Sequence, residues 1–459
     1  MMSELRLKIS FWCGLVAILS PLVFLGCAEP SSSPGADARE EVVFWHFWGG
    51  RDRKIVDEVV TRFNQSQEKY RVRALAFPGA NLDLKFFLSV AGGDPPDVLN
   101  CDDPIVGDWA ERGILTPLDE LTSKEEYEQL QDWLFPAAKN LGTYQDCMYA
   151  VCNGLDVRAL YCNATLLAEH ELPLPRTIED LDRIANTIAP PEGQTGRTRM
   201  GYLPDPRRIW AWGVVFGGDF ANLAADNAIE IITADSPPVL SALQWMANYS
   251  ERYGVSEVTA FRSGEQALTG STFPLLADRR YAVMMDGQWR VRDIAESQAA
   301  AKQRNQSFDQ YKVVALPPPT GGREDAGWVN GNFFVVPQLA KQKQGALQFM
   351  KFWIGMSENA DGAARACADG GWIPVSQQVV DQKIFQTALD ERPLLKQFVR
   401  LAASPNQMPV PALPVASTYY QQVVSAAQAV MYRGESPEVA LKKAADQTRA
   451  RLQEVIDAE

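Results

Sequence analysis

The fold of this chain is decided by a stretch that begins with Glu41-Val-Val-Phe-Trp-His-Phe-Trp48 and continues to about residue 100. The β-branched and aromatic residues over 41–48, stopped by Gly49-Gly50, predict a buried strand. The pattern beyond it predicts a helix around 55–63, a strand over 70–77, a helix over 82–91 and a short strand over 96–100. Strands that alternate with helices indicate a parallel sheet covered by helices, in which ligands bind at the carboxyl ends of strands.

The rest of the chain carries further segments of both kinds. We expect strands over 149–152, 159–162, 280–285, 311–316 and 332–337, and mostly helix over 344–356 and 419–458. With 459 residues, the chain is long enough for two or three domains. The sequence therefore predicts an α/β protein with substantial hydrophobic cores.

The charge balance argues against several classes of function. There are 44 Lys and Arg residues against 57 Asp and Glu residues, which gives a formal net charge of −13. A nucleic-acid groove needs clustered basic residues, so we expect no nucleic-acid partner. The acidity also makes an anionic solute the weaker expectation. The only histidines are His46 and His170, which argues against a His-rich metal site, and we expect no metal and no cofactor.

The N-terminal residues 1–26 have the features of a secretory signal peptide. Basic residues precede an apolar run of about 16 residues, which is shorter than the roughly 20 that a transmembrane anchor requires. The ending Leu25-Gly26-Cys27 resembles a bacterial lipobox, so we expect Cys27 to be lipidated and residues 27–40 to form a flexible linker. No other run is apolar enough to span a membrane.

The remaining cysteines leave two alternatives open. Of the seven cysteines, Cys13 and Cys27 belong to the N-terminal segment, and the other five are Cys101, Cys147, Cys152, Cys162 and Cys367. In an oxidising compartment a local disulfide among the middle three is one alternative, and buried unpaired thiols are the other.

Several short motifs occur in a fixed order along the chain. The most specific is Ala91-Gly-Gly-Asp-Pro-Pro-Asp-Val98, which is close to A-x-G-D-P-P-D-V. The others are Gly113-Ile-Leu-Thr-Pro-Leu-Asp-Glu-Leu121, Asp156-Val-Arg-Ala-Leu-Tyr-Cys-Asn163, Thr177-Ile-Glu-Asp-Leu181, Gly217-Gly-Asp219, Met284-Met-Asp-Gly-Gln-Trp289 and Gly434-Glu-Ser-Pro-Glu-Val-Ala-Leu441. This ordered set resembles the bacterial extracellular solute-binding proteins of ABC sugar importers, of the maltose-binding type, over most of residues 42–445.

The resemblance implies a two-lobed periplasmic-binding-protein fold of type II. Each lobe would hold a mixed, mostly parallel sheet covered by helices, and the ligand cleft would lie between the lobes. The first lobe would comprise residues 41–154 plus 331–372, and the second lobe residues 157–328 plus 375–459. The hinge crossings would fall near Leu155-Asp156, Val329-Asn330 and Ile373-Pro374. Closure around a ligand would be a hinge motion.

The same resemblance implies a function in transport rather than catalysis. We expect a monomeric, extracytoplasmic, lipid-anchored protein that captures a sugar, in particular an oligosaccharide, and delivers it to the transmembrane subunits of an ABC permease. Three alternatives remain: a polyamine binder, a ferric iron carrier that uses Tyr419-Tyr420, and a secreted glycoside hydrolase.

Candidate ligand contacts combine aromatic rings, which match the C–H faces of sugars, with polar groups, which match their hydroxyls. Trp48 is preferred over Trp45 and Phe47 because successive strand residues alternate between the two faces of a sheet. Packing in the core is the alternative for each tryptophan, and His46 is expected to be a hydrogen-bonded structural residue. The full set of candidates is Trp48, Asp102, Asp103, Asp156, Trp289, Trp328, Trp372 and Tyr419, with Trp210 and Trp212 as weaker ones.

Overall fold

The structure is a computed structural model, and it describes residues 38–102, 105–188, 199–225, 227–266 and 278–458. The expected signal peptide, Cys27 and nearly all of the linker lie outside the described residues, as does Asp103. Among the described residues, no helix combines the length and apolar character that crossing a membrane would require.

The first hundred residues form the predicted alternation of strands and helices. The elements are β1 Glu40–His46, α1 Gly50–Ser66, β2 Tyr70–Ala76, α2 Leu82–Ala91 and β3 Val98–Asp102. Strand β1 lies between β2 and β3 and pairs with both in parallel. The prediction of a parallel arrangement in this stretch is confirmed.

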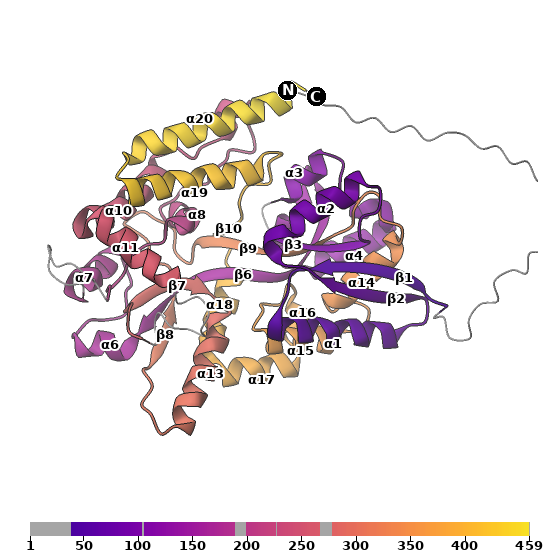
Figure 1. The fold of residues 1–459 in the computed structure, drawn as a ribbon, viewed down its shortest axis with the longest axis horizontal. Helices are drawn as coiled ribbons and strands as arrows, with labels where there is room; N and C mark the ends of the chain where they lie inside the picture. Colours follow the sequence, from indigo (N-terminus) through magenta and orange to yellow (C-terminus); the bar gives the residue numbers. More distant parts are fainter. Residues whose placement is uncertain (1–37, 103–104, 189–198, 226, 267–277, 459) are drawn as a thin grey trace, which may run out of the picture. The chain divides into compact units, whose positions relative to one another are not determined.

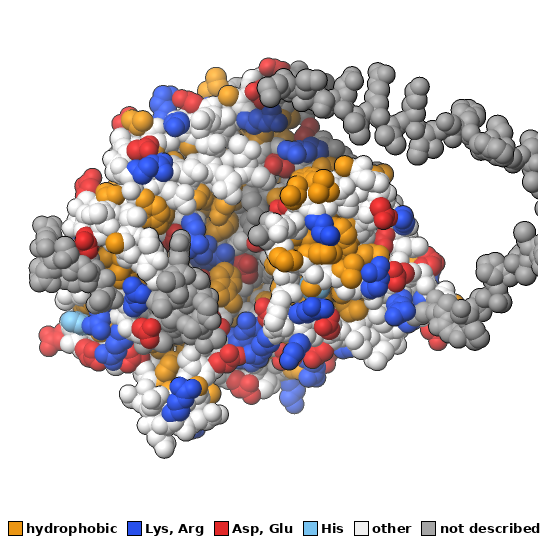
Figure 2. All heavy atoms as spheres, in the orientation of Figure 1, with side chains coloured by type: hydrophobic (Ala, Val, Ile, Leu, Met, Phe, Trp, Pro, Cys, Tyr) orange, Lys and Arg blue, Asp and Glu red, His pale blue; other side chains and the backbone are white. Residues whose placement is uncertain are grey.

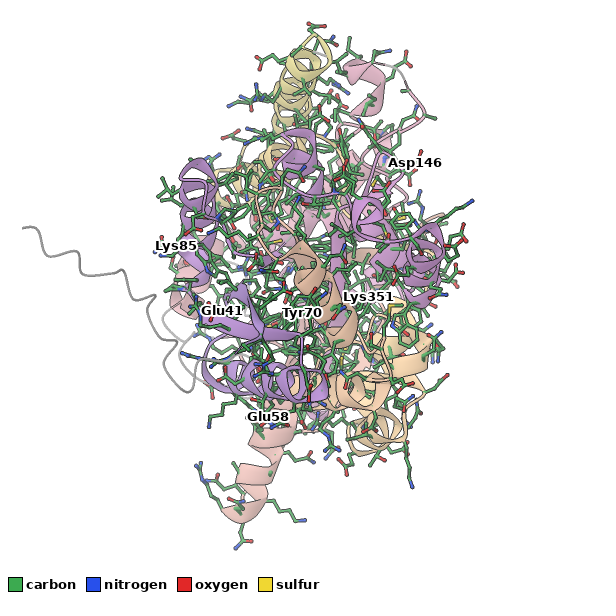
Figure 3. The ribbon with its side chains drawn as sticks, turned by 90° about the vertical axis from the view of Figure 1, so that its right-hand side faces the viewer. Glu41, Glu58, Tyr70, Lys85, Asp146 and Lys351 are labelled. Carbon is green, nitrogen blue, oxygen red and sulfur yellow. The ribbon has the colours of Figure 1, made fainter. Side chains whose placement is uncertain are left out.

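Helix α1 shows how the apolar spacing of the sequence is used. It buries one face, formed by Ile55, Val56, Val59, Val60 and Phe63, and it exposes Glu58 on the other. Figure 3 shows Glu58 on the outer side of this helix, while Tyr70 of β2 lies in the interior with 2% of its surface exposed. The helix therefore covers this end of the sheet through the face that its 3.6-residue period predicts.

Two long strands cross the middle of the sheet (Figure 1). They are β6, Ala150–Asn163, and β9, Gly327–Val335, which pair with each other in antiparallel fashion. The segments predicted as strands over 149–152 and 159–162 lie almost entirely in β6, and the residues between them, which were not assigned to a strand, continue the same strand. A β-bulge between Cys152 and Gly154 absorbs the irregularity while the pairing with β9 continues.

The remaining strands attach to these two. Strands β7, Val283–Gly287, and β8, Tyr311–Val314, pair antiparallel with the second half of β6, and β3 pairs antiparallel with β9. The short strand β10, Gln407–Met408, pairs with the start of β9. Within the described residues, this makes one mixed sheet with the order β2-β1-β3-β9-β6-β7, and a separate small pair of β4, Thr143–Tyr144, and β5, Cys147–Met148.

Helices surround this sheet. The predicted C-terminal helix over 419–458 is interrupted at Gly434, whose φ of +69° ends one helix before Pro437 begins the next. These two helices are α19 Ala416–Arg433 and α20 Pro437–Ile456. The described residues also form α3 Val106–Glu111, α4 Lys124–Trp133, α5 Pro136–Leu141, α6 Ala164–Glu169, α7 Ile178–Ile188, α8 Ile209–Val215, α9 Ala228–Ile231, α10 Pro237–Tyr253, α11 Val255–Gln266, α13 Arg290–Gln303, α14 Lys343–Trp353, α15 Ala360–Gly370, α16 Gln377–Val380, α17 Lys383–Glu391 and α18 Pro393–Ala402.

A buried carboxylate joins distant parts of the predicted first lobe. Asp97 is 4% exposed and accepts hydrogen bonds from the backbone N–H groups of Val43 at 2.8 Å, Lys341 at 2.9 Å and Gln342 at 2.7 Å. These bonds tie β1 to the segment that leads into α14. Asp97 therefore holds together the two separated stretches from which the predicted first lobe is built.

The three predicted hinge crossings lie side by side. Asp156 of β6 is opposite Asn330 of β9, and the N–H of Leu155 donates to the carbonyl oxygen of Ile373 at 3.1 Å. Segments separated by more than 170 positions thus meet in the middle of the sheet, and the side chains around this point are the natural place to search for a binding site.

Candidate functional site

The crossing point carries a half-buried carboxyl group on Asp156. Its Oδ1 accepts a hydrogen bond from Nε2 of Gln288 at 2.6 Å, and the same amide donates to the carbonyl of Leu155 at 3.1 Å. Burial raises the pKa of Asp156, against the opposing effect of the guanidinium of Arg158. The Gln288 amide thus fixes Asp156 at the junction of the strands.

Arg158 lies two residues further along β6, on the same face of the strand as Asp156. It is 4% exposed, and its guanidinium lies between two indole rings, 4.7 Å from the ring centre of Trp289 and 5.1 Å from that of Trp328. Its Nε and Nη1 atoms are buried without a hydrogen-bond partner among the described residues. A buried guanidinium with unpaired donors is energetically costly, which marks this position as a candidate contact for a ligand.

The side chains of Arg208 and Tyr420 also lie close to Trp328. The guanidinium of the half-buried Arg208 lies 5.9 Å from the centre of the Trp328 ring, and the ring of Tyr420 lies 5.7 Å from it. Burial, with the nearby Arg158 as the next cause, lowers the pKa of Arg208 to about 10. Figure 2 shows basic side chains exposed in a hollow of the surface over the middle of the sheet, where Figure 1 draws β6 and β9.

Trp289 is held in place by the backbone before it. It follows β7, it is half-buried, and its ring lies so close to Gly287 that a Cβ atom there would come within 2.3 Å of the ring. Asp286 fixes the same turn by accepting from the N–H of Gly287 at 2.9 Å and from Arg290 at 2.7 Å. Trp289 therefore has a defined orientation beside Arg158.

A second aromatic group contains Trp48 and Trp372. Trp48 is 7% exposed and is stacked on Trp353 of α14 with ring centres 5.5 Å apart and an interplanar angle of 9°. The half-buried Trp372 lies 5.5 Å from Trp48 and 6.2 Å from Trp353. Trp48 is thus an inner member of an aromatic stack, and Trp372 is the member that keeps more exposed surface.

The structure places the candidate Asp102 at the surface and the candidate Tyr419 in the interior. Asp102 is exposed and accepts a hydrogen bond from Asn332 at 3.3 Å. Tyr419 is fully buried, its hydroxyl donates to the carbonyl of Phe220, and burial raises its pKa far above the usual range. The neighbouring Tyr420 is the one that reaches Trp328. The ferric alternative relied on Tyr419 and Tyr420 as phenolate ligands, and burial disfavours the ionised form of Tyr419 that it needs.

Metal ligation and disulfide bonding find no support in the described part of the chain. No group of three or more His, Cys, Asp or Glu side chains there is arranged to hold a metal ion. The five cysteines beyond residue 100 are all present as thiols, and four of them are buried. His46 is 1% exposed and stacks on Phe44, but its Nδ1 has no hydrogen-bond partner among the described residues, so its expected hydrogen bond is not found at that atom.

Comparison with known proteins now gives the family. A family model described as "Bacterial extracellular solute-binding protein" matches residues 58–391, which is well over half of the chain. The chain belongs to this family. As a solute-binding protein it is not an enzyme, which removes the glycoside hydrolase alternative, and membership in an extracellular family places it outside the cytoplasm.

Individual relatives of this solute-binding protein are distant. The alpha-glucosides-binding periplasmic protein AglE of Rhizobium meliloti (strain 1021) is 24% identical over 206 residues, a match that spans 44% of this chain and 41% of AglE. The structure of CpMnBP1 with mannotriose bound is similar with a TM-score of 0.72 and 24% identity, over 89% of this chain and all of that one. The structure of the sugar-binding protein MalE of Xanthomonas citri is similar with a TM-score of 0.71 and 16% identity, over 91% of this chain and all of that one. These structures establish the fold, and the expected periplasmic-binding-protein architecture is confirmed.

Sequence reasoning missed several side chains of the candidate site. They are Arg158, Arg208, Gln288 and Trp353. Arg158 could have been predicted, because it belongs to the same motif as Asp156 and residues two positions apart lie on the same face of a strand. Gln288 likewise precedes Trp289 directly. Arg208 and Trp353 carry no such signal, since only the folded chain brings α8 and α14 to these positions.

Proposed function

We propose that this solute-binding protein captures an oligosaccharide between its two lobes and delivers it to the transmembrane subunits of an ABC importer. The lobes are those predicted from the sequence, residues 41–154 plus 331–372 and residues 157–328 plus 375–459. The adjacency of the three crossings supports this division, because hinges need a few neighbouring backbone segments that bend together.

The observation that carries the proposal is the chemistry around the crossing point. Indole and phenol rings from Trp289, Trp328 and Tyr420 gather there with hydrogen-bonding groups from Asp156 and Arg208. Aromatic rings next to carboxyl and guanidinium groups match the alternating apolar and hydroxyl surfaces of a sugar. The relatives agree with this reading, since AglE is named for alpha-glucosides and CpMnBP1 was solved with mannotriose.

We also propose that the protein acts as a monomer anchored by lipid on Cys27. The apolar segment and lipobox-like ending support the anchor, which would keep the protein near a permease. Expression in a bacterial host with labelled fatty acid provides the test. Label should enter the membrane-bound protein and be lost in Cys27→Ala, and an unlabelled wild-type protein would remove the anchor from the proposal.

Titration calorimetry against a panel of oligosaccharides tests the sugar-binding function. We expect at least one to bind, and we expect Trp289→Ala to weaken that binding by more than about 1 kcal/mol, because stacking of an indole ring on a sugar is lost. Trp45→Ala is the matched control, since Trp45 is also a half-buried tryptophan but packs near Phe77 and Lys85, away from the crossing.

The two variants distinguish the loss of a solute contact from a general loss of packing. Affinity should fall in Trp289→Ala and remain within about twofold in Trp45→Ala, with thermal melting used to verify that both proteins are folded. Equal affinity of Trp289→Ala and wild type would remove Trp289 from the site. A protein that binds a polyamine but no sugar would overturn the proposed function itself.

A further inference from the structure

Two arginines at the candidate site lack the partners that buried arginines usually have. Neither Arg158 nor Arg208 forms an ion pair or a side-chain hydrogen bond with any residue that the structure describes, and the buried unpaired atoms are Nε and Nη1 of Arg158 and Nε of Arg208. Both guanidinium groups lie over the Trp328 ring, at 5.1 and 5.9 Å from its centre. Two like charges are therefore held near one another on a shared aromatic surface.

The acidic groups near these arginines are already engaged. Asp286 forms an ion pair with Arg290 at 2.7 Å, and Asp205 pairs with its neighbour Arg207 at 2.6 Å. Asp156 accepts from Gln288, and burial raises its pKa, which favours its neutral form. The positive charge of the two arginines is thus left without a dedicated counter-charge from the described chain.

We propose that Arg158 and Arg208 recognise an oxyanion group on the solute, a carboxylate or a sulfate carried by a sugar ring. This inference rests on the proposed sugar-binding function and narrows it to acidic oligosaccharides. Guanidinium groups donate parallel hydrogen bonds to planar carboxylates and tetrahedral sulfates, and these charge-assisted bonds are stronger than bonds to neutral hydroxyls. The adjacent Trp289 and Trp328 rings would hold the sugar ring that carries the group.

The arrangement reverses an expectation based on net charge. A chain with a net charge of −13 disfavours anionic solutes at long range, but screening limits such effects to about 10 Å at ordinary salt. At contact distance the two arginines determine the preference for an anionic solute, because a desolvated charge interacts strongly with its immediate neighbours. The proximity of Arg158 contributes to lowering the pKa of Arg208 to about 10, and a bound anion would relieve that repulsion.

Calorimetry with matched trisaccharides tests the inference. The probes are mannotriose and maltotriose, their uronic acid counterparts trimannuronate and triglucuronate, and maltotriose sulfated at one C6 position. We expect at least one acidic probe to bind at least tenfold more tightly than its neutral counterpart, with an affinity that falls as sodium chloride rises. The uronate and sulfate arms show which oxyanion the pair prefers.

The variants Arg158→Gln and Arg208→Gln identify the residues responsible. Each should weaken binding of the acidic probe at least tenfold, and by a factor at least three times larger than the factor by which it weakens binding of the neutral probe. Because Arg158→Gln alters a buried side chain, Arg208→Gln, at a half-buried position, keeps the test open if the first variant does not fold. Arg279→Gln, at a partly exposed position with its own acidic partners, controls for loss of charge.

The outcomes separate this inference from the function on which it rests. Neutral sugars that bind as tightly as acidic ones, or a preference for acidic sugars that survives both arginine variants, would overturn the inference and leave the sugar-binding function intact. Failure of every sugar, neutral and acidic, to bind would overturn both.

Discussion

The affinity for the solute should depend on Arg292, which follows Trp289 by three residues and joins the two predicted lobes. This residue of α13, in the predicted second lobe, forms an ion pair with Asp52 of α1 at 2.8 Å and donates to the carbonyl of Gly370 at 3.1 Å. Both partners belong to the predicted first lobe. A second pair, between Arg51 and Glu296, joins the same two helices.

The structure gives the size of the effect. The side chains of Arg292 and Asp52 are 18% and 29% exposed, so their ion pair should contribute about 0.5–1 kcal/mol. The hydrogen bond from a charged donor to the Gly370 carbonyl should add about 1 kcal/mol. Contacts that exist only when the lobes meet stabilise the closed form, so Arg292→Ala should weaken solute binding by about 1.5–2 kcal/mol, or roughly 10- to 30-fold.

Calorimetry gives the dissociation constant, and stopped-flow tryptophan fluorescence gives the dissociation rate, which should carry most of the change. Arg279→Ala is the matched control, because Arg279 loses comparable bonds to Asp309 and Glu169 that lie wholly within the second lobe. An affinity of Arg292→Ala within twofold of wild type, or an equal loss in Arg279→Ala, would refute the argument that these contacts link closure to binding.

Three further predictions concern positions outside direct solute contact. Asp97→Ala should lower the free energy of unfolding by about 3 kcal/mol or more, because three buried N–H groups lose a charged acceptor, and urea denaturation with Asp97→Asn as an intermediate variant measures it. Gly287→Ala should reduce solute affinity about as much as Trp289→Ala, since a Cβ atom within 2.3 Å must displace the indole ring; unchanged affinity with a folded protein would contradict this. Burial lowers the pKa of His46 to about 4, so its contribution to stability is complete above pH 6.5 and is lost as the pH falls toward 4. His46→Phe should flatten this part of the curve of melting temperature against pH, whereas the exposed His170→Gln should leave it unchanged.

The alternation of strands and helices over residues 40–102 followed from the sequence because it depends on local periodicity. Apolar residues at helical spacing in α1 and dense β-branched and aromatic residues in β1 each specify their own element. The motifs gave the family for a similar reason, since each is a short run whose turn residues fix local geometry. The polar residues in the middle of β6 were not assigned to a strand, because their strand conformation is stabilised by pairing with β9, more than 160 positions away.

The candidate site, like the fold, was predicted from the sequence only in part. Asp156, Trp289 and Trp328 were proposed from strand ends and motifs, and the structure brings all three near Arg158. The local sequence did not decide whether a tryptophan packs in the core or faces the crossing point. Trp48 is an example, because it is stacked on Trp353. The sequence by itself determined the elements, the family and the residue types suited to a sugar. Only the tertiary structure decided that Arg158 and Arg208 share one indole surface without acidic partners, because the pairing of charges depends on distances across the fold and not on spacing along the chain.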